Sequence, residues 1–175
     1  MGITMQNHGG YTETYDNFPE NYYKVGRSYT DANQYLSLVH ESDEAVKNLI
    51  SYFSKVDDPV EIIFFGDHQP SLNSNFYPIL NGKGLTGLTE DELEKLYTVP
   101  FFIWTNYDTP EETVDITSLD YLSTMALERA GIELPAYNKF LADMQEVVPA
   151  INSRGYYSKS AGGFLHIEEA TGEEA

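Results

Sequence analysis

The chain has 175 residues and a formal net charge of −18, and so acidic a chain argues against a nucleic-acid partner, whose phosphates require clustered Lys and Arg. It contains no cysteine, which excludes disulfides, thiolate nucleophiles and cysteine-ligated zinc. A hydrophobic fraction of 41% indicates a folded globular domain, and no stretch approaches the roughly 18 consecutive apolar residues of a membrane span.

The N-terminal region combines a strand end, a glycine turn and a polar loop. Ile3 to Met5 reads as the tail of a strand, and residues 6–11 turn at once through His8 and two glycines. Because a domain rarely opens on a strand end, we expect the chain to be the C-terminal part of a longer protein. His8 is a candidate for substrate contact, proton transfer or metal ligation, or is an exposed turn residue. Residues 12–27 are expected to form an excursion loop.

A long amphipathic helix is predicted next, with Ser28 or Thr30-Asp31 as candidate caps. Apolar residues recur at i, i+3, i+4 and i+7 spacing, the pattern of a helix with one buried face. The predicted stripe consists of Ala32, Tyr35, Leu36, Val39, Val46, Leu49, Ile50 and Phe53. His40 is expected to be a packed or surface residue of this helix.

Residues 60–65 form a nearly continuous apolar run, which predicts a strand covered on both faces. Gly66, Asp67 and His68 follow it directly and open a loop to residue 88, a length that is uncommon unless functional. In α/β proteins ligands bind outside the carboxyl ends of the strands. A carboxylate oxygen and an imidazole nitrogen together suit zinc or manganese. Asp67 and His68 are therefore candidate metal ligands. The alternative is that Asp67 caps its loop and His68 donates to a backbone carbonyl.

The remaining chain alternates helices with a further strand. Thr89–Glu92 is a capping box that opens a short acidic helix, and residues 99–106 form a second apolar strand. Ser118 is expected to cap a helix that Gly131 ends, and another helix starts near Pro135.

The C-terminal end of the pattern is less regular. Residues 150–158 form either a last strand or an irregular return, so residues 1–160 make up the predicted folded part. Residues 161–175, including His166, are expected to be a disordered acidic tail. The order of elements predicts an α/β fold with a mainly parallel sheet and helices on both faces.

Five segments of the chain resemble one known family. They are Thr4-Met5-Gln6-Asn7-His8, Tyr29-Thr30-Asp31, Gly66-Asp67-His68-Gln69-Pro70, Pro100-Phe101-Phe102-Ile103-Trp104 and the run from Ala126 to Pro135. In combination they resemble the lipoteichoic acid synthase-like branch of the sulfatase and alkaline phosphatase superfamily. The resemblance extends from Ile3 to about Phe140 and implies the C-terminal part of a three-layer, alkaline-phosphatase-like catalytic domain.

The resemblance implies a metal-dependent phosphoglycerol transferase. Enzymes of this branch use a threonine, activated on a divalent metal, to attack phosphatidylglycerol, and then pass glycerophosphate to a polymer or glycolipid. It implies that Asp67 and His68 hold the metal, usually manganese, with magnesium, calcium or zinc as alternatives. It also implies that His8 contacts the substrate.

The resemblance assigns no catalytic nucleophile in this chain. The threonine and a glutamate ligand of the family belong before Ile3, so the fragment alone is expected to be inactive and to bind manganese weakly. The parent protein is expected at a bacterial cell membrane, with its catalytic domain outside the cell and an anionic lipid or polymer as substrate. The missing N-terminal half would be its partner, and the chain would be a monomer or an oligomer caused by truncation.

Two other functions remain open. One is a sulfatase, or a phosphonate or phosphodiester hydrolase, of the same superfamily, which a different nucleophile would distinguish. The other is a non-catalytic cell-surface module that binds glycan through exposed aromatic residues. Its candidates are Tyr22-Tyr23, Phe76-Tyr77 and Tyr156-Tyr157.

Overall fold

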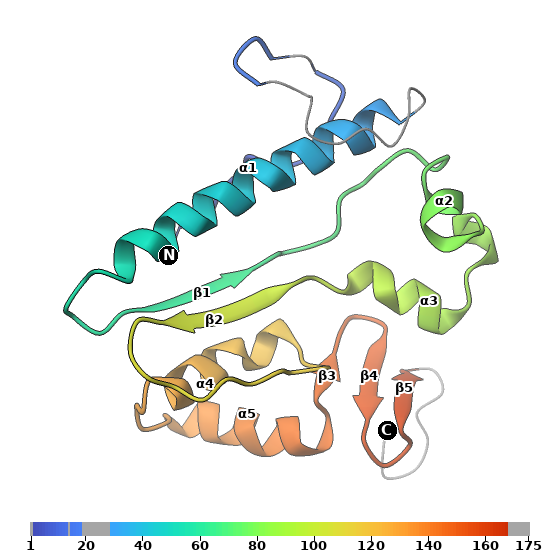
Figure 1. Cartoon of the computed structure of the whole chain (residues 1–175). Helices are drawn as coiled ribbons and strands as arrows, with labels where there is room; N and C mark the ends of the chain where they lie inside the picture. The colour runs from blue at the N-terminus through green and yellow to red at the C-terminus, as the bar shows by residue number, and fades with distance from the viewer. Residues whose placement is uncertain (1, 14, 19–28, 168–175) are drawn as a thin grey trace. The chain divides into compact units, whose positions relative to one another are not determined.

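The computed structural model describes residues 2–13, 15–18 and 29–167. Helices and strands both occur along these residues, which confirms the predicted α/β class, but the last three strands pair antiparallel and not in the mainly parallel arrangement that was expected (Figure 1). The chain divides into two compact units, one consisting of Met1–Val60 and Phe64–Phe102, the other of Glu61–Ile63 and Ile103–Ala175. Tyr22-Tyr23 and most of the predicted 12–27 loop lie outside the described residues.

Helix α1, Thr30–Phe53, lies where the apolar periodicity predicts a long helix. Its N-cap residue is Tyr29, which makes no side-chain cap, and Thr30 is already helical. The residues that α1 buries are Ala32, Gln34 and Ser37. Val39 and Leu49 of the predicted stripe are 38% and 43% exposed, so the stripe does not coincide with the buried side.

The N-terminal segment determines which side of α1 is buried. Gln34 Nε2 donates to the carbonyl oxygen of Glu13 at 2.7 Å. The ring of Tyr11 meets that of Tyr35 edge-on, with centroids 5.4 Å apart. Backbone groups of an irregular segment need hydrogen-bond partners when they are covered, and a glutamine on the helix supplies one. Periodicity of apolar residues alone therefore misses this contact.

Strands β1 and β2 pair into a two-stranded sheet; their bounds are Glu61–Phe65 and Phe101–Thr105. Phe64 stacks on Phe102 with ring centroids 5.2 Å apart, and Gly66 N donates to Pro100 O at 3.1 Å. Between these two contacts the residue number rises on one strand and falls on the other, as it does in an antiparallel pair.

The end of β1 is less covered than its composition predicts. Ile63, Phe64 and Phe65 are 39%, 37% and 43% exposed among the described residues. The continuous apolar run predicted cover on both faces. Over the described part of the chain that prediction is wrong, because the faces of a strand are covered only where helices or loops pack on them, and these three side chains are left partly open.

Four short helical segments connect β1 to β2: α2, Tyr77–Asn81; η1, Leu85–Gly87; α3, Glu90–Glu94; and η2, Lys95–Tyr97. The predicted capping box is confirmed, because Thr89 N donates to Glu92 Oε2 at 2.7 Å and Glu92 N donates to Thr89 Oγ1 at 3.4 Å. Lys83 Nζ lies 2.7 Å from Glu92 Oε2. The hydrogen bond from Lys83, followed by that from the Thr89 backbone, lowers the pKa of Glu92 from 4.5 to about 2.

Replacing Glu92 with glutamine is expected to flatten the acid dependence of stability. Because the pKa of Glu92 is depressed in the folded chain, its stabilising contribution is present above about pH 4.5 and is lost as the pH falls to about 2. The urea midpoint of Glu92→Gln should therefore fall less over this range than that of the unmodified chain. Asp91→Asn removes the same charge from the same helix. Equal flattening in both variants would assign the effect to net charge and contradict the role of Lys83 and Thr89.

Helices α4, Leu119–Arg129, and α5, Ala136–Val147, pack against each other in the second unit (Figure 1). The side chains buried in the two helices are Tyr121, Leu122, Thr124, Ala126, Asn138 and Leu141. Asn138 Nδ2 donates to Thr124 Oγ1 at 3.0 Å, which satisfies a buried amide between the helices. Gly131, with φ of +67°, ends α4 as predicted.

Ser118 occupies the N-cap position of α4, but its side chain does not cap the helix. The hydroxyl donates to the carbonyl oxygen of Ile151 at 2.8 Å and accepts from Ile151 N at 2.6 Å. It therefore satisfies both backbone groups of a residue in strand β3, Ala150–Ile151, and fixes this strand to the start of α4. The predicted cap is wrong because a serine at this position serves a neighbouring strand equally well.

The C-terminal sheet is antiparallel and has the order β3-β4-β5; β4 is Gly155–Ser158 and β5 is Gly163–His166. Residues 163–166 were expected within a disordered tail. They form a strand instead because Gly162, with φ of +68°, reverses the chain and Phe164 pairs opposite Tyr157. His166 packs edge-on against Phe164, with centroids 5.4 Å apart. Residues 168–175 lie outside the described residues. None of the described helices has the length and apolar composition of a membrane span.

Candidate functional site

Asp67 and His68 directly follow β1, as the sequence predicts. Gly66 before them allows β1 and β2 to stay close at this end, because a Cβ at this position would lie 3.2 Å from Val99 Cβ. The Gly66 N–H also donates to the Pro100 carbonyl. The acid and the imidazole are thus placed at the end of a paired strand, where polar side chains are free to project.

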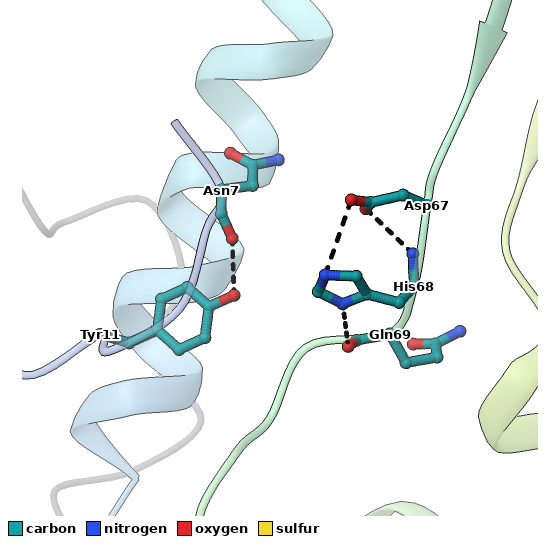
Figure 2. Close-up of polar contacts among 5 residues, drawn as sticks. All are labelled: Asn7, Tyr11, Asp67, His68 and Gln69. Carbon is teal, nitrogen blue, oxygen red and sulfur yellow. Dashed lines mark hydrogen bonds and ion pairs between the residues drawn. The ribbon is translucent and has the colours of Figure 1, made fainter. Parts of the chain in front are cut away.

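The Asp67-His68 pair is internally hydrogen-bonded, and both side chains remain exposed. Asp67 Oδ1 accepts from His68 N at 2.9 Å, and His68 Nδ1 lies 2.9 Å from the carbonyl oxygen of Gln69 (Figure 2). A carbonyl only accepts, so Nδ1 carries a proton toward Gln69, and Nε2 is the ring nitrogen on the side of Asp67. His68 Nε2 lies 3.6 Å from Asp67 Oδ2, and the side chains are 66% and 83% exposed.

This arrangement fits a divalent cation. Carboxylate oxygen and imidazole nitrogen ligands lie about 2.0–2.2 Å from zinc, so one ion reaches two atoms that are 3.6 Å apart. Within the described residues no group of three or more His, Cys, Asp or Glu gathers to hold a metal. Asp67 and His68 therefore offer one oxygen and one nitrogen atom to a cation, and the described residues add no third group beside them.

Two further contacts hold the loop that carries the pair. The side-chain amide of Gln69 donates to the carbonyl of Thr98. Farther along the loop, Asn73 N donates to Asp31 Oδ2 at 2.6 Å, which fixes the loop to the first turn of α1. Gln69 therefore has two roles: its side chain holds the loop to Thr98, and its carbonyl orients the ring of His68. Neither contact carries a signal in the sequence, since each joins residues far apart in the chain.

His8 lies on an exposed turn, and its N–H donates to the Met5 carbonyl at 3.1 Å. The turn is anchored through Asn7, whose carbonyl accepts from the Tyr11 hydroxyl at 2.6 Å (Figure 2). Ser42 Oγ of α1 donates to Asn7 Oδ1 at 3.1 Å. Among the described contacts none joins His8 to Asp67 or His68. The structure therefore brings two of the three predicted site residues together.

Tyr11 anchors this turn through its bond to Asn7, a role that the sequence pattern did not indicate. It is 7% exposed and adopts a φ of +30°, which is unusual for a residue other than glycine. Burial, followed by the neighbouring Tyr35, raises the pKa of its hydroxyl, so the group stays a neutral donor to Asn7. The preceding Gly9-Gly10 pair predicted a turn, but not this anchor.

A second polar cluster lies in the other unit. Tyr107 OH donates to Glu61 Oε2 at 3.4 Å, and burial raises the pKa of Glu61, opposed by that bond and by Arg129. Arg129 Nη2 donates to the Pro110 carbonyl at 2.6 Å. A cavity of about 510 Å³ beside Arg129 is lined by Ile103, Glu111, Glu112 and Thr113. These contacts hold the loop after β2 and supply neither a nucleophile nor a ligand set.

Comparison with known proteins identifies a family and several relatives. Residues 1–132 match the sulfatase family. The chain is 28% identical over 154 residues to the putative cyclic beta-1,2-glucan modification protein of Rhizobium meliloti (strain 1021), covering 83% of this chain and 24% of that protein. It is 41% identical over 51 residues to the capsular polysaccharide biosynthesis protein RkpI of the same organism, covering 29% and 10%.

Among solved structures, the chain is similar to the Streptococcus pyogenes phosphoglycerol transferase GacH in complex with sn-glycerol-1-phosphate. The TM-score is 0.62 at 18% identity, over 86% of this chain and 37% of that one. At this identity the likeness is one of fold. The chain spans about a quarter of the length of the glucan modification protein and just over a third of the solved transferase.

Proposed function

Because this chain belongs to the sulfatase family, we propose that the protein containing it is a metal-dependent transferase that moves glycerophosphate to a cell-surface glycan or glycolipid. The names of its relatives support a glycan acceptor, since one modifies a glucan and another serves capsular polysaccharide biosynthesis. The fold it shares with a phosphoglycerol transferase supports the transferred group. We place this activity at the outer face of a bacterial cell membrane, with phosphatidylglycerol as donor.

One observation carries the proposal: an acid and a correctly oriented imidazole project together from the end of β1. The Gln69 carbonyl keeps His68 in the form that is protonated at Nδ1, which leaves Nε2 as a ligand atom. Asp67 Oδ2 lies 3.6 Å from that nitrogen and contributes negative charge. High exposure of both side chains leaves them accessible to further ligands and to substrate.

The residues of this chain would have distinct roles. Asp67 and His68 would each give one ligand atom to the cation, for which manganese is our first choice. When bound, the cation supplies positive charge that stabilises the phosphoryl group and activates a hydroxyl nucleophile. His8, on its anchored turn, would donate a hydrogen bond to the phosphate or glycerol. The threonine nucleophile and the glutamate ligand that the resemblance implies are assigned to no residue of this chain.

Hydrolysis of a sulfate or phosphate ester is the second candidate function, and the family match favours it because the family is that of the sulfatases. The same ligand pair would serve either reaction. What differs is the group that accepts the transferred moiety, water in a hydrolase and a sugar hydroxyl in a transferase. Product analysis with phosphatidylglycerol and a glycan acceptor separates transfer from phosphodiester hydrolysis, since a phosphodiester hydrolase releases free glycerophosphate regardless of the acceptor.

Calorimetric titration with manganese tests the ligand assignment. The complete gene product should bind manganese, and the variant that combines Asp67→Ala with His68→Ala should lose that binding. The fold should persist in the variant because both side chains are largely exposed, and circular dichroism checks this. Asp91→Asn controls for the loss of one negative charge. Binding that is unchanged in the double variant would show that the pair is structural and would overturn the proposal.

A further inference from the structure

The second unit contains a groove that the proposed chemistry does not use. It has a volume of about 460 Å³ and lies between α4, α5 and the turn after β3. Its floor includes the buried Tyr121 and Leu141. Two aromatic residues of α5 form its rim: Tyr137 is 70% exposed and Phe140 is 58% exposed. Exposed aromatic rings beside a hollow are a common feature of ligand sites.

The two rim rings lie on one side of α5, because they are three residues apart in the helix. Met144, one turn farther along, continues the apolar wall. Polar residues line the groove as well, among them Asp120 and Ser153. The groove thus combines flat apolar surfaces with hydrogen-bonding groups, a combination that suits a sugar ring, whose C–H face stacks on aromatic rings while its hydroxyls bond to acceptors.

The charges around the groove favour a neutral ligand over an anionic one. Asp120 is the only charged residue among those that line the groove in the described part of the chain. Two lysines are paired with glutamates: Lys139 Nζ lies 3.1 Å from Glu133, and Lys159 Nζ lies 3.8 Å from Glu146. With a net charge of −18 on the chain, the surroundings repel a polyanion. A neutral chain of sugars meets no such repulsion.

We propose that this groove binds a neutral oligosaccharide segment of the acceptor glycan. The inference rests on the proposed function for the identity of the glycan as acceptor, and it adds a binding site for this glycan that is made of residues other than Asp67 and His68. Tyr137 and Phe140 supply the stacking surfaces, and Asp120 accepts hydrogen bonds from sugar hydroxyls. A neutral glycan is favoured over an anionic polymer because Asp120 and the net negative charge of the chain both repel anions.

Binding of defined oligosaccharides tests the groove directly. The complete gene product is titrated by calorimetry with laminarihexaose and cellohexaose, and separately with hexagalacturonic acid as the anionic counterpart. We expect a neutral hexasaccharide to bind and the anionic one to fail. Tyr137→Ala and Phe140→Ala should each weaken binding by about tenfold, the loss expected for one buried aromatic contact. Tyr52→Ala, which removes a tyrosine that is 66% exposed on α1, should bind as the unmodified protein does.

The results also separate this inference from the proposed function. Manganese binding should be unchanged in Tyr137→Ala and Phe140→Ala, so loss of glycan binding with normal metal binding supports a distinct site. Equal binding of the anionic hexasaccharide, no binding of any of the three, or equal binding by the groove variants would each overturn the inference. Sedimentation of the variants tests whether a second copy of the chain occupies the groove. A dimer that Phe140→Ala abolishes would identify the groove as a contact between copies of the chain and not as a glycan site.

Discussion

Replacing Asp67 with asparagine is expected to lower the rate of glycerophosphate transfer by the complete gene product by more than about 100-fold, since even outer-shell partners of a metal ligand are worth 10–100-fold. Asparagine keeps an oxygen that accepts the hydrogen bond from His68 N, which is 2.9 Å long in the native chain. It removes the negative charge that a divalent cation requires. The measurement is the initial rate with phosphatidylglycerol and a glycan acceptor across a range of manganese concentrations.

Two comparisons make this expectation specific. Asp91→Asn removes the same charge from an exposed helix and should leave the rate unchanged. The urea midpoint of Asp67→Asn should match that of the unmodified protein, because the Asp67 side chain is 83% exposed. A variant that folds normally and transfers glycerophosphate at the native rate would contradict the role of Asp67 in the reaction.

The sequence predicted the candidate pair, because its signal is local: an apolar run ends in a glycine and the two polar residues follow at once. The orientation of His68 was not predictable in the same way. It depends on which carbonyl approaches Nδ1, and the sequence leaves donation to a backbone carbonyl and metal binding as alternatives for His68. The Gln69 contact shows that the two are compatible, since it leaves Nε2 for a ligand.

The contacts that anchor the His8 turn could not be predicted from the sequence. Asn7 bonds to Ser42 across 35 positions, and Tyr11 packs on Tyr35. Side chains of this kind serve equally well as solvated residues, so nothing in the local pattern marks them. The structure shows an ordered turn around His8, whereas contact between His8 and substrate remains a prediction.

Among the elements of the fold, those with end signals were predicted best. The capping box at Thr89 and the stop at Gly131 follow from local backbone chemistry, whereas α1 was predicted from its apolar periodicity and none of its predicted caps lies at its N-cap position, Tyr29. Strand β5 was missed because the acidic composition after residue 167 dominated the interpretation of the whole tail. The Gly162-Gly163 pair between two aromatic runs is a hairpin signal that would have identified it.

Burial in α4 and α5 does not follow the hydrophobicity of the side chains. Leu119 and Phe140 are 39% and 58% exposed, while Thr124 and Asn138 are buried. The two polar residues satisfy each other through a 3.0 Å hydrogen bond, so their burial costs little. A count of apolar residues cannot anticipate such a pair, because its stability depends on both helices at once.

Tyr121 combines full burial with a hydrogen-bonded hydroxyl, so its substitution is the sharpest test of the core. It is fully buried, and its hydroxyl donates to the Val148 carbonyl at 2.6 Å, so the ring fills the space between the helices while the hydroxyl ties α4 to the end of α5. Tyr121→Ala is expected to lower the free energy of unfolding by about 3–5 kcal/mol, as truncation of a buried aromatic ring does. Tyr121→Phe keeps the ring and leaves one carbonyl unsatisfied, which should cost about 1–3 kcal/mol.

The two substitutions separate packing from hydrogen bonding when urea unfolding is followed by the fluorescence of Trp104, the single tryptophan of the chain. Tyr137→Ala is the matched control, because its ring is 70% exposed and its loss should change the free energy by less than about 0.5 kcal/mol. If Tyr121→Ala were no more destabilising than Tyr137→Ala, the ring would not be part of a packed core. If Tyr121→Phe matched Tyr121→Ala, the hydroxyl bond to Val148 would dominate over the ring, and the polar contacts of these helices would be the main source of their stability.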